Sequence, residues 1–354
     1  MLYQTENQHG GDVYGGGITL DFSANTNPLG TPPGVLEAVC RALPQLHRYS
    51  DPYCRRLVQA IAAHEQVPAS YILCGNGAAD LIYTYCAALR PRTAVELAPT
   101  FVEYGAGLAQ VGCRVERYFL HQAQNFDLDE RFLSFLEEKK PEVVFLCNPN
   151  NPTGRLIPLP LLEQILQYCA AQGARLFLDE CFLDLTEDGV SAKSLLAAHP
   201  ELLILKAFTK SYGMAGIRLG YCLCADSALL RRMASASQPW NVSSLAQSAG
   251  VAALAEQDFL RRTLALVRKE RRWLTDNLTA LGFWVCPSQA NYLLFRGPRG
   301  LREGLLRRGI AIRGCGNYNG LDDGWYRIAV RPHEENEALI TAIRQFCEEK
   351  SLWQ

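Results

Sequence analysis

Residues 205–220 have the sequence LKAFTKSYGMAGIRLG, and this stretch is the most informative in the chain. It begins at the end of an aliphatic segment, 202–206, which is typical of a buried strand. Lys210 comes just after that segment, a glycine-rich loop follows, and Arg218 lies eight residues beyond Lys210. This order can present an amine and a guanidinium to one small anionic ligand. The alternative interpretation is a surface lysine and an ordinary loop, because lysine is usually exposed.

The segments around this stretch alternate between two types. Short aliphatic runs, several of which end in Gly, Asn or Asp, indicate buried strands, and segments with apolar residues three and four positions apart indicate helices. The expected strands are 72–74, 93–97, 115–119, 143–147, 176–178, 202–206 and 219–224, and the expected helices include 79–89 and 161–172. The alternation predicts an α/β fold, a mostly parallel sheet covered by helices on both faces.

The pattern changes towards the carboxyl terminus. Residues 243–281 form a nearly unbroken helical pattern with a basic centre, and after it strands at 292–295, 310–313 and 325–330 precede a helix at 334–348. This order predicts a smaller α+β domain. The first fifty residues contain too many Gly, Pro and Asn for a core element. We therefore expect an N-terminal segment, 1–45, that packs with the small domain, a large domain, 46–245, and a bridging helix with the small domain, 246–354.

Composition and charge exclude several classes of protein. The 354 residues include 35 basic and 36 acidic side chains, a formal charge of -1, so the chain lacks the basic excess of a dedicated nucleic-acid binder. No apolar run reaches the ~18 residues that span a bilayer, and residues 1–11 do not resemble a signal peptide. The thirteen cysteines lie mostly in apolar runs, with no C-x-x-C pair. They predict packing in a reducing cytoplasm rather than metal ligation.

Three further motifs follow expected strands. Residues 148–154, NPNNPTG, follow the strand 143–147, and Asp179-Glu180 ends the next strand. Because α/β folds place ligands at the carboxyl edge of the sheet, these side chains are candidates for one site. Residues 74–80, CGNGAAD, join a strand to a helix N-terminus, where free N–H groups favour a phosphate. Each motif alone is also compatible with an ordinary turn or cap, whereas together in this order they favour a site.

With these motifs the chain resembles the fold-type I pyridoxal-phosphate enzymes of the class I/II aminotransferase superfamily, and within them the histidinol-phosphate aminotransferase branch. The resemblance extends over essentially the whole chain and is closest to the threonine-phosphate decarboxylases of cobalamin biosynthesis. The segments that favour this subgroup are HGG at 9–11, DFSANTNPLG at 21–30, IRGCGNY at 312–318 and YRIAVR at 326–331. It implies an aspartate-aminotransferase-like large domain with a smaller domain, and pyridoxal 5'-phosphate as cofactor.

The resemblance also implies roles in cofactor binding. Lys210 would bond the cofactor aldehyde and later move protons, and Asp179 would keep the ring nitrogen protonated. Asn151 would donate to the 3-oxygen, and Phe101 would stack on the ring unless it is only a core residue. The cofactor phosphate would be held by Gly77, Ala78, Ala79, Thr209 and Arg218. Tyr49 would reach the same phosphate across the interface of a homodimer with shared active sites, or be an interface aromatic only.

Substrate recognition needs two anion sites if the substrate carries a carboxylate and a phosphate. The resemblance implies that Arg327 binds the substrate carboxylate, and Arg313 lies on a neighbouring expected strand, so both could face the cofactor from the small domain. His9 and Asn25 could close over the substrate phosphate, and Asn151 is also expected to bind substrate. His9 could equally be a surface histidine in a glycine-rich tail. One departure from the aminotransferase pattern is Phe182, where many aminotransferases have a tyrosine that donates to the 3-oxygen. It modestly favours a decarboxylase.

The expected activity is decarboxylation of L-threonine O-3-phosphate to (R)-1-amino-2-propanol O-2-phosphate. The alternative is a histidinol-phosphate aminotransferase, which would share the cofactor residues. A non-catalytic relative that only binds the cofactor is disfavoured by the intact Lys210 and Asp179. The partners expected are a small phosphorylated amino acid and a second copy of the chain, with no nucleic acid, membrane or metal.

Overall fold

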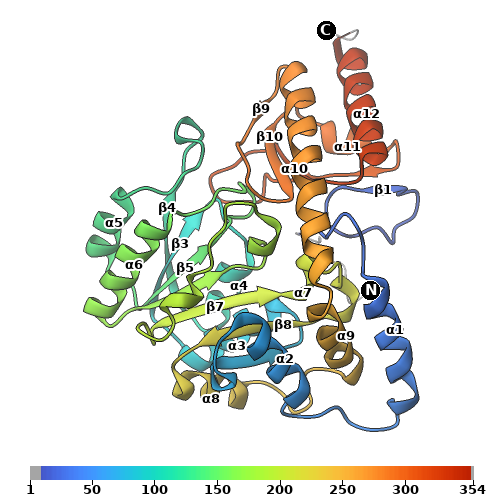
Figure 1. Cartoon of the computed structure of the whole chain (residues 1–354). Coiled ribbons are helices and arrows are strands. Elements are labelled where there is room, and N and C mark those ends of the chain that lie inside the picture. The colour runs from blue at the N-terminus through green and yellow to red at the C-terminus, as the bar shows by residue number, and fades with distance from the viewer. Residues whose placement is uncertain (1–8, 352–354) are drawn as a thin grey trace.

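The computed structural model describes residues 9–351, and its largest element is a seven-stranded sheet (Figure 1). The strand order is β2-β8-β7-β6-β5-β3-β4. Only β8 runs antiparallel to its neighbours, which confirms the mostly parallel sheet. The strands are β2 (Ile72–Gly75), β3 (Thr93–Ala98), β4 (Arg114–Phe119), β5 (Val143–Cys147), β6 (Arg175–Asp179), β7 (Leu202–Ala207) and β8 (Gly220–Cys224).

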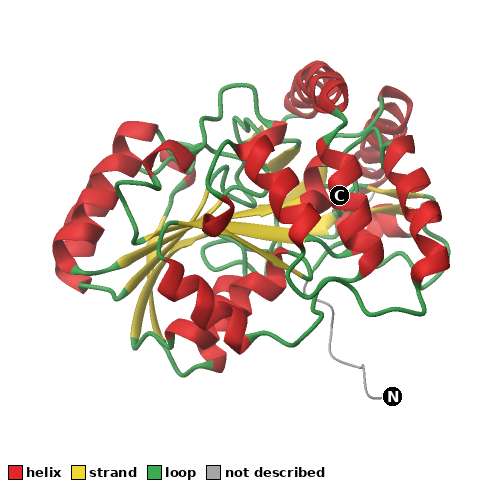
Figure 2. Ribbon diagram, turned by 60° about the horizontal axis from the view of Figure 1, so that its bottom comes forward, coloured by secondary structure: helices red, strands yellow, loops and turns green. Residues whose placement is uncertain are grey.

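Helices cover both faces of this sheet (Figure 2). Successive side chains of a strand point to opposite faces, so Val143 and Phe145 join one apolar cluster and Val144 and Leu146 the other. The first cluster includes side chains of α3 (Ala78–Leu89), α4 (Glu103–Gln110) and α8 (Ser227–Ala236). The second includes side chains of α2 (Arg55–Glu65), α5 (Arg131–Lys139), α6 (Leu159–Gln172) and α9 (Ser244–Leu254). Burial on both faces explains why these strands are almost entirely apolar.

The carboxyl ends of the parallel strands bring the sequence motifs to one edge. Cys147 of β5 pairs with Asp179 of β6, and Asp179 pairs with Leu205 of β7. The NPNNPTG loop, Asp179 and the short helix α7 (Phe208–Ser211) therefore start at the same level of the sheet. Lys210 lies on α7, three residues beyond β7. The fold thus assembles one site from segments far apart in the sequence.

The carboxyl-terminal part forms the smaller α+β unit. Its antiparallel sheet has the order β12-β13-β10-β9, and its helices pack on a separate apolar cluster. The elements are β9 (Trp284–Val285), β10 (Tyr292–Arg296), α11 (Leu301–Leu306), β12 (Arg313–Gly314), β13 (Trp325–Ala329) and α12 (His333–Ser351). The prediction of a single strand at 310–313 is wrong, because the structure has two short strands there. The segment splits at Ile312, because β11 (Ile310–Ala311) pairs with β1 (Leu20–Asp21) whereas β12 pairs with β13.

The nearly unbroken helical stretch expected over 243–281 consists of two separate helices. The structure has α9 and α10 (Gln257–Ala280), separated at Ala255 and Glu256. α9 ends at Leu254, and Glu256, the residue before α10, has a non-helical ψ of 61°. The break lets α9 pack on α1 (Pro33–Ala42) and α2, while α10 packs on α12 and β9.

The first fifty residues were expected to contain no core element, but the structure shows that some of them contribute to the core. Phe22, beside β1, is fully buried in the small-unit cluster. In contrast, α1 packs on α9 and buries Val35 in the core of the large unit. Proline at the start of α1 is compatible with a helix because its missing N–H is not needed there. The domain boundaries at 45 and 245 remain predictions.

Two other expectations from the sequence concern membrane-spanning helices and the cysteines. Within residues 9–351, no helix is long and apolar enough to cross a membrane. All thirteen cysteines lie in the part of the chain that the structure describes; none of them forms a disulfide there, and most are buried. This confirms their interpretation as mainly packing residues.

Candidate active site

A cavity of about 240 Å³ opens where the sheet edge meets the small unit. It brings together twelve of the fourteen residues predicted from sequence. Its lining is His9, Gly10, Ser23, Ala24, Asn25, Ala78, Ala79, Phe101, Cys147, Asn151, Asp179, Cys181, Phe182, Ala207, Thr209, Lys210, Arg218, Arg313, Tyr318 and Arg327. The predicted residues outside this lining are Gly77 and Tyr49.

Lys210 lies in the wall of this cavity, partly accessible from it. Its Nζ is 5.4 Å from the centre of the Phe182 ring. Loss of solvation, together with the charges of Arg327 and Arg218, lowers the pKa of Lys210 to about 8. An amine with that pKa is partly neutral near pH 7, and the neutral form is the nucleophile. The residue therefore has the chemistry of a reactive lysine.

Asp179 lies at the end of β6 and is buried. The Tyr104 hydroxyl donates to its Oδ2 at 2.6 Å, and the Cys181 N–H donates to its Oδ1 at 2.9 Å. Burial raises the pKa of Asp179, and these two bonds and Lys210 only partly offset that effect. A buried carboxylate of this kind is best stabilised by a cationic group in the cavity.

An anion cradle lies at the start of α3. Ala78 and Ala79 line the cavity, and the preceding Gly77 has a φ of +89°. A Cβ at Gly77 would lie 2.6 Å from Nη2 of Arg218, so glycine allows the guanidinium to reach the helix end. The free N–H groups of the first turn, the Thr209 hydroxyl and Arg218 together suit a phosphate.

The opposite wall carries a second cationic centre. Arg327 donates from Nη1 to Oδ1 of Asn151 at 2.5 Å and from Nη2 to the Ser23 carbonyl at 2.8 Å. Its buried Nε has no hydrogen-bond partner within residues 9–351, and neither does the side-chain amide of Asn25. Buried polar atoms without partners are costly, so both side chains favour a polar ligand in the cavity.

Arg313 and His9 complete the cavity. Arg313 donates to Oδ1 of Asn317 at 2.8 Å, and its guanidinium lies 5.4 Å from the centre of the Tyr318 ring. His9 Nε2 lies 2.7 Å from Oε1 of Glu103. His9 is therefore docked against the cavity in this structure, rather than on a remote surface.

Two predicted aromatics have different surroundings. Phe101 lies in the cavity wall and packs edge-to-face against Tyr104. Tyr49 does not line the cavity; it is 80% exposed and stacks on Trp240 with ring centres 4.4 Å apart. An exposed aromatic pair leaves its predicted role across a dimer interface untested.

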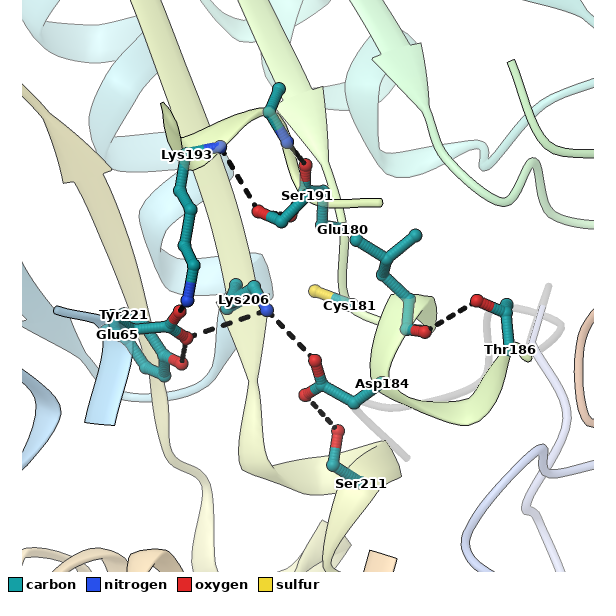
Figure 3. A network of polar contacts seen from close by, with 12 residues as sticks. Glu65, Glu180, Cys181, Asp184, Thr186, Ser191, Lys193, Lys206, Ser211 and Tyr221 are labelled. Atoms are coloured by element: carbon teal, nitrogen blue, oxygen red, sulfur yellow. Dashed lines mark hydrogen bonds and ion pairs between the residues drawn. The ribbon is translucent and has the colours of Figure 1, made fainter. Parts of the chain in front are cut away.

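Lys206 lies in a network of charged and polar side chains that includes Ser211, the neighbour of Lys210 (Figure 3). Lys206 of β7 contacts Asp184 at 2.9 Å and Glu65 at 3.5 Å, and Asp184 accepts a bond from Ser211, next to Lys210. Burial alone would lower the pKa of Lys206, but the neighbouring carboxylates raise it. Lys206 is therefore held as a cation in ion pairs. In this it differs from Lys210, four residues away, whose pKa is lowered.

The profile of the family described as aminotransferase class I and II matches residues 18–343. The chain belongs to this family. It is 41% identical over 331 residues to the threonine-phosphate decarboxylase of Salmonella typhimurium, covering 92% of this chain and 90% of that protein. It is 34% identical over 346 residues to the histidinol-phosphate aminotransferase of Geobacillus sp. strain WCH70, covering 96% and 93%. The solved L-threonine-O-3-phosphate decarboxylase of Porphyromonas gingivalis matches with a TM-score of 0.82 at 26% identity, covering 93% of this chain and 99% of that one.

Membership of this family makes the chain a pyridoxal-phosphate-dependent enzyme with the aspartate-aminotransferase-like fold. The cavity fits that cofactor. Lys210 supplies an amine of lowered pKa, Asp179 a buried carboxylate, and the Gly77 turn with Arg218 an anion cradle. The expected cofactor is thus compatible with the donors that the fold places here.

Sequence reasoning missed several residues of the site. Tyr104, which bonds Asp179, lies in the first turn of α4, and its role depends on a partner 75 positions away in the sequence. Ser23 and Tyr318 lie inside quoted motifs but had no assigned role. Glu103 carried no motif at all, because its partner His9 is distant in sequence.

Proposed function

We propose that this enzyme decarboxylates L-threonine O-3-phosphate to (R)-1-amino-2-propanol O-2-phosphate, a step of cobalamin biosynthesis. The observation that carries the proposal is its 41% identity, over 92% of the chain, to the Salmonella typhimurium threonine-phosphate decarboxylase. The identity to the Geobacillus histidinol-phosphate aminotransferase is lower, 34%. The distribution of charge in the cavity supports the same substrate class.

The cavity offers separate places for two anionic groups besides the cofactor phosphate. Arg327, with its buried unpartnered Nε, suits a carboxylate. Arg313, His9 and the amide of Asn25 lie in the same lining and suit a phosphate. A substrate with a carboxylate and a phosphate would neutralise cations that otherwise face one another. This arrangement accounts for a basic cavity in a chain of nearly zero net charge.

When bound, pyridoxal phosphate supplies a conjugated ring that accepts the electron pair released as a bond at the substrate Cα breaks. Arg218, Thr209 and the N–H groups at the start of α3 would bind its phosphate, and Asp179 would hold a proton at the ring nitrogen. The Asn151 oxygen accepts from Arg327, so its amide N–H would be the group that donates to the 3-oxygen. Phe101 would cover the ring.

The outcome of the reaction depends on how the substrate is anchored in the cavity. Arg327 would bind the carboxylate and Arg313 the phosphate, and this pair of contacts would fix the orientation of the substrate Cα. Lys210 would hold the proton that Cα takes up when carbon dioxide leaves. The pKa of about 8 suits Lys210 to moving protons near neutral pH.

Phe182 gives secondary support. Its ring faces Lys210 and packs edge-to-face on Tyr292 with ring centres 4.9 Å apart. A phenylalanine here cannot donate to the cofactor 3-oxygen as the tyrosine of many aminotransferases does. The alternative function, histidinol-phosphate aminotransferase, is favoured by the similarity to such enzymes over 96% of the chain.

The proposal includes a homodimer in which Tyr49 of each copy reaches the other copy's cofactor phosphate. The exposed Tyr49–Trp240 pair supports an aromatic surface at that position. We also propose a cytoplasmic location, because thirteen cysteines without a disulfide among residues 9–351 suit a reducing compartment.

Parallel product assays test the proposed reaction. The purified holoenzyme is incubated with phosphothreonine, phosphoserine or histidinol phosphate, with 2-oxoglutarate as amino acceptor, and carbon dioxide and glutamate are measured separately. We expect carbon dioxide and the amino-alcohol phosphate from phosphothreonine, with no matching glutamate. Glutamate formation from histidinol phosphate, without carbon dioxide from phosphothreonine, would favour the histidinol-phosphate aminotransferase over the decarboxylase.

A further inference from the structure

Residues 9–11 lie between the two sides of the cavity. His9 and Gly10 both line it. His9 contacts Glu103, the first residue of α4 in the large unit, and the Gly11 N–H donates to Oγ of Ser23 at 2.8 Å. Ser23 follows β1, which pairs with β11 of the small unit. This short segment therefore connects both sides of the cavity.

Glu103 is well placed to hold His9. Its Oε1 lies 2.7 Å from His9 Nε2, and its Oε2 accepts a bond from the Tyr83 hydroxyl at 2.6 Å. The hydrogen bond with His9 lowers the pKa of Glu103, more than burial raises it, so the side chain is a carboxylate near neutral pH. Only 16% of the Glu103 side chain is exposed, which limits screening of the pair by solvent.

The contact at Gly10 is too close for any other residue. A Cβ at Gly10 would lie 2.2 Å from the Ser23 carbonyl oxygen. That same oxygen accepts the bond from Nη2 of Arg327 at 2.8 Å. The backbone of the segment therefore packs directly on the group that orients a cation of the cavity.

We propose that Glu103 is a positioning residue for substrate binding: with Gly10 it docks residues 9–11 over the cavity and places His9 beside the substrate phosphate. This inference rests on the proposed function and deepens it. His9 itself contacts substrate, whereas Glu103 acts only through His9. Tyr83 fixes the carboxylate orientation from the far side.

Kinetics of Glu103 variants test the inference. We expect Glu103→Ala to raise the KM for phosphothreonine about tenfold, as for loss of a charge-assisted hydrogen bond, and to change kcat less than about threefold. Glu103→Gln keeps an oxygen that accepts from His9, so its KM should rise less. Gly10→Ala changes residues 9–11 rather than α4, and it should raise the KM as Glu103→Ala does. The control is Glu138→Gln, an acid 68% exposed on α5 that pairs with Lys139, which should match the wild type.

Amide hydrogen exchange of the holoenzyme without substrate supplies a second readout. Glu103→Ala and Gly10→Ala should speed exchange in the peptide covering residues 9–12 by about threefold or more, because the docked segment opens more often. Glu138→Gln should not. Unchanged KM in both variants, or a loss of kcat without a change in KM, overturns the inference whatever the exchange result. If the wild type forms no carbon dioxide from phosphothreonine, the proposed function fails, and the exchange data still decide whether Glu103 docks the segment.

Discussion

At the residue scale, the anion cradle that we propose for the cofactor phosphate depends on the absence of a side chain at Gly77. Gly77→Ala places a Cβ 2.6 Å from Nη2 of Arg218 and strains a residue with a φ of +89°. We expect the dissociation constant of pyridoxal phosphate to rise about tenfold or more, since both effects act on the phosphate site. Absorbance titration of the cofactor-free protein measures this.

Gly112→Ala is the matched control for that change. Gly112 also has a positive φ, +72°, but an added Cβ would meet nothing within 4 Å. It therefore has comparable backbone strain without the collision with Arg218, and cofactor affinity should be unchanged. Equal loss of affinity in the two variants would argue that strain, and not the Arg218 contact, explains the result.

Tyr104 provides a second test at this scale. Tyr104→Phe removes the hydroxyl that donates to Asp179, a bond that holds the carboxyl pKa down. Asp179 should then support a protonated ring nitrogen less well, so we expect kcat to fall about tenfold with KM changed little. Steady-state kinetics with phosphothreonine measure both constants. A variant with wild-type kcat would show that Tyr104 serves packing alone.

The sequence allowed most single residues of the cavity to be predicted because each sits in a local motif. Lys210, Asp179 and Asn151 all follow a recognisable strand, and parallel strands end at a common edge. Tyr104 was missed because the bond that gives it a role joins residues 75 positions apart. Gly77 was predicted from its turn, but its close approach to Arg218 is visible only in three dimensions.

At the scale of elements, the buried strands were predictable and the helix break was not. Runs such as β5 and β7 are apolar throughout because both faces are covered. The break at Ala255 and Glu256 has no Gly or Pro to signal it, and it follows from two helices packing on different partners. The split at Ile312 has the same origin, since the two short strands join different sheets.

The network behind β7 makes a testable contribution to stability (Figure 3). Burial tends to raise the pKa of Glu65, but Lys206, the Tyr221 hydroxyl and Lys193 together lower it to about 2. Glu65→Gln should therefore reduce the free energy of unfolding at pH 7 by about 3 kcal/mol. Urea unfolding measures the loss.

The pH dependence of that loss has a definite direction. A carboxyl with a lowered folded-state pKa stabilises the fold above its ordinary pKa of 4.5, and this contribution is lost as the pH falls towards 2. The difference between Glu65→Gln and the wild type should therefore shrink below about pH 4.5. Glu138→Gln, at an exposed acid, should show no difference at either pH. If the difference in free energy of unfolding between Glu65→Gln and the wild type stays constant with pH, the cause is a packing defect at position 65.

At the scale of the whole molecule, we propose a homodimer whose two copies share their active sites. Tyr49 lies outside its own cavity, exposed and stacked on Trp240. We expect Tyr49→Ala and Lys210→Ala each to be inactive or nearly so. Equal mixing and reassembly should restore about a quarter of wild-type activity, because half of the dimers are mixed and each mixed dimer has one intact site.

Complementation of this kind requires exchange between copies, so the mixture is assayed after reversible dissociation and after simple mixing. Recovery only after dissociation supports shared sites. Mixtures that never exceed the activity of the separate variants, while wild type recovers after the same treatment, would place Tyr49 outside the active site.

The central claim is that the cofactor binds Lys210 in this cavity, and the chain offers a second lysine, Lys206, only four residues earlier. Lys206 is held in ion pairs with Asp184 and Glu65, whereas Lys210 faces the cavity with a pKa of about 8. Reducing the holoenzyme with borohydride fixes the cofactor to the lysine that binds it, and peptide mass spectrometry locates it. We expect cofactor mass on Lys210 alone. Cofactor mass on Lys206, or on any other lysine, would contradict it.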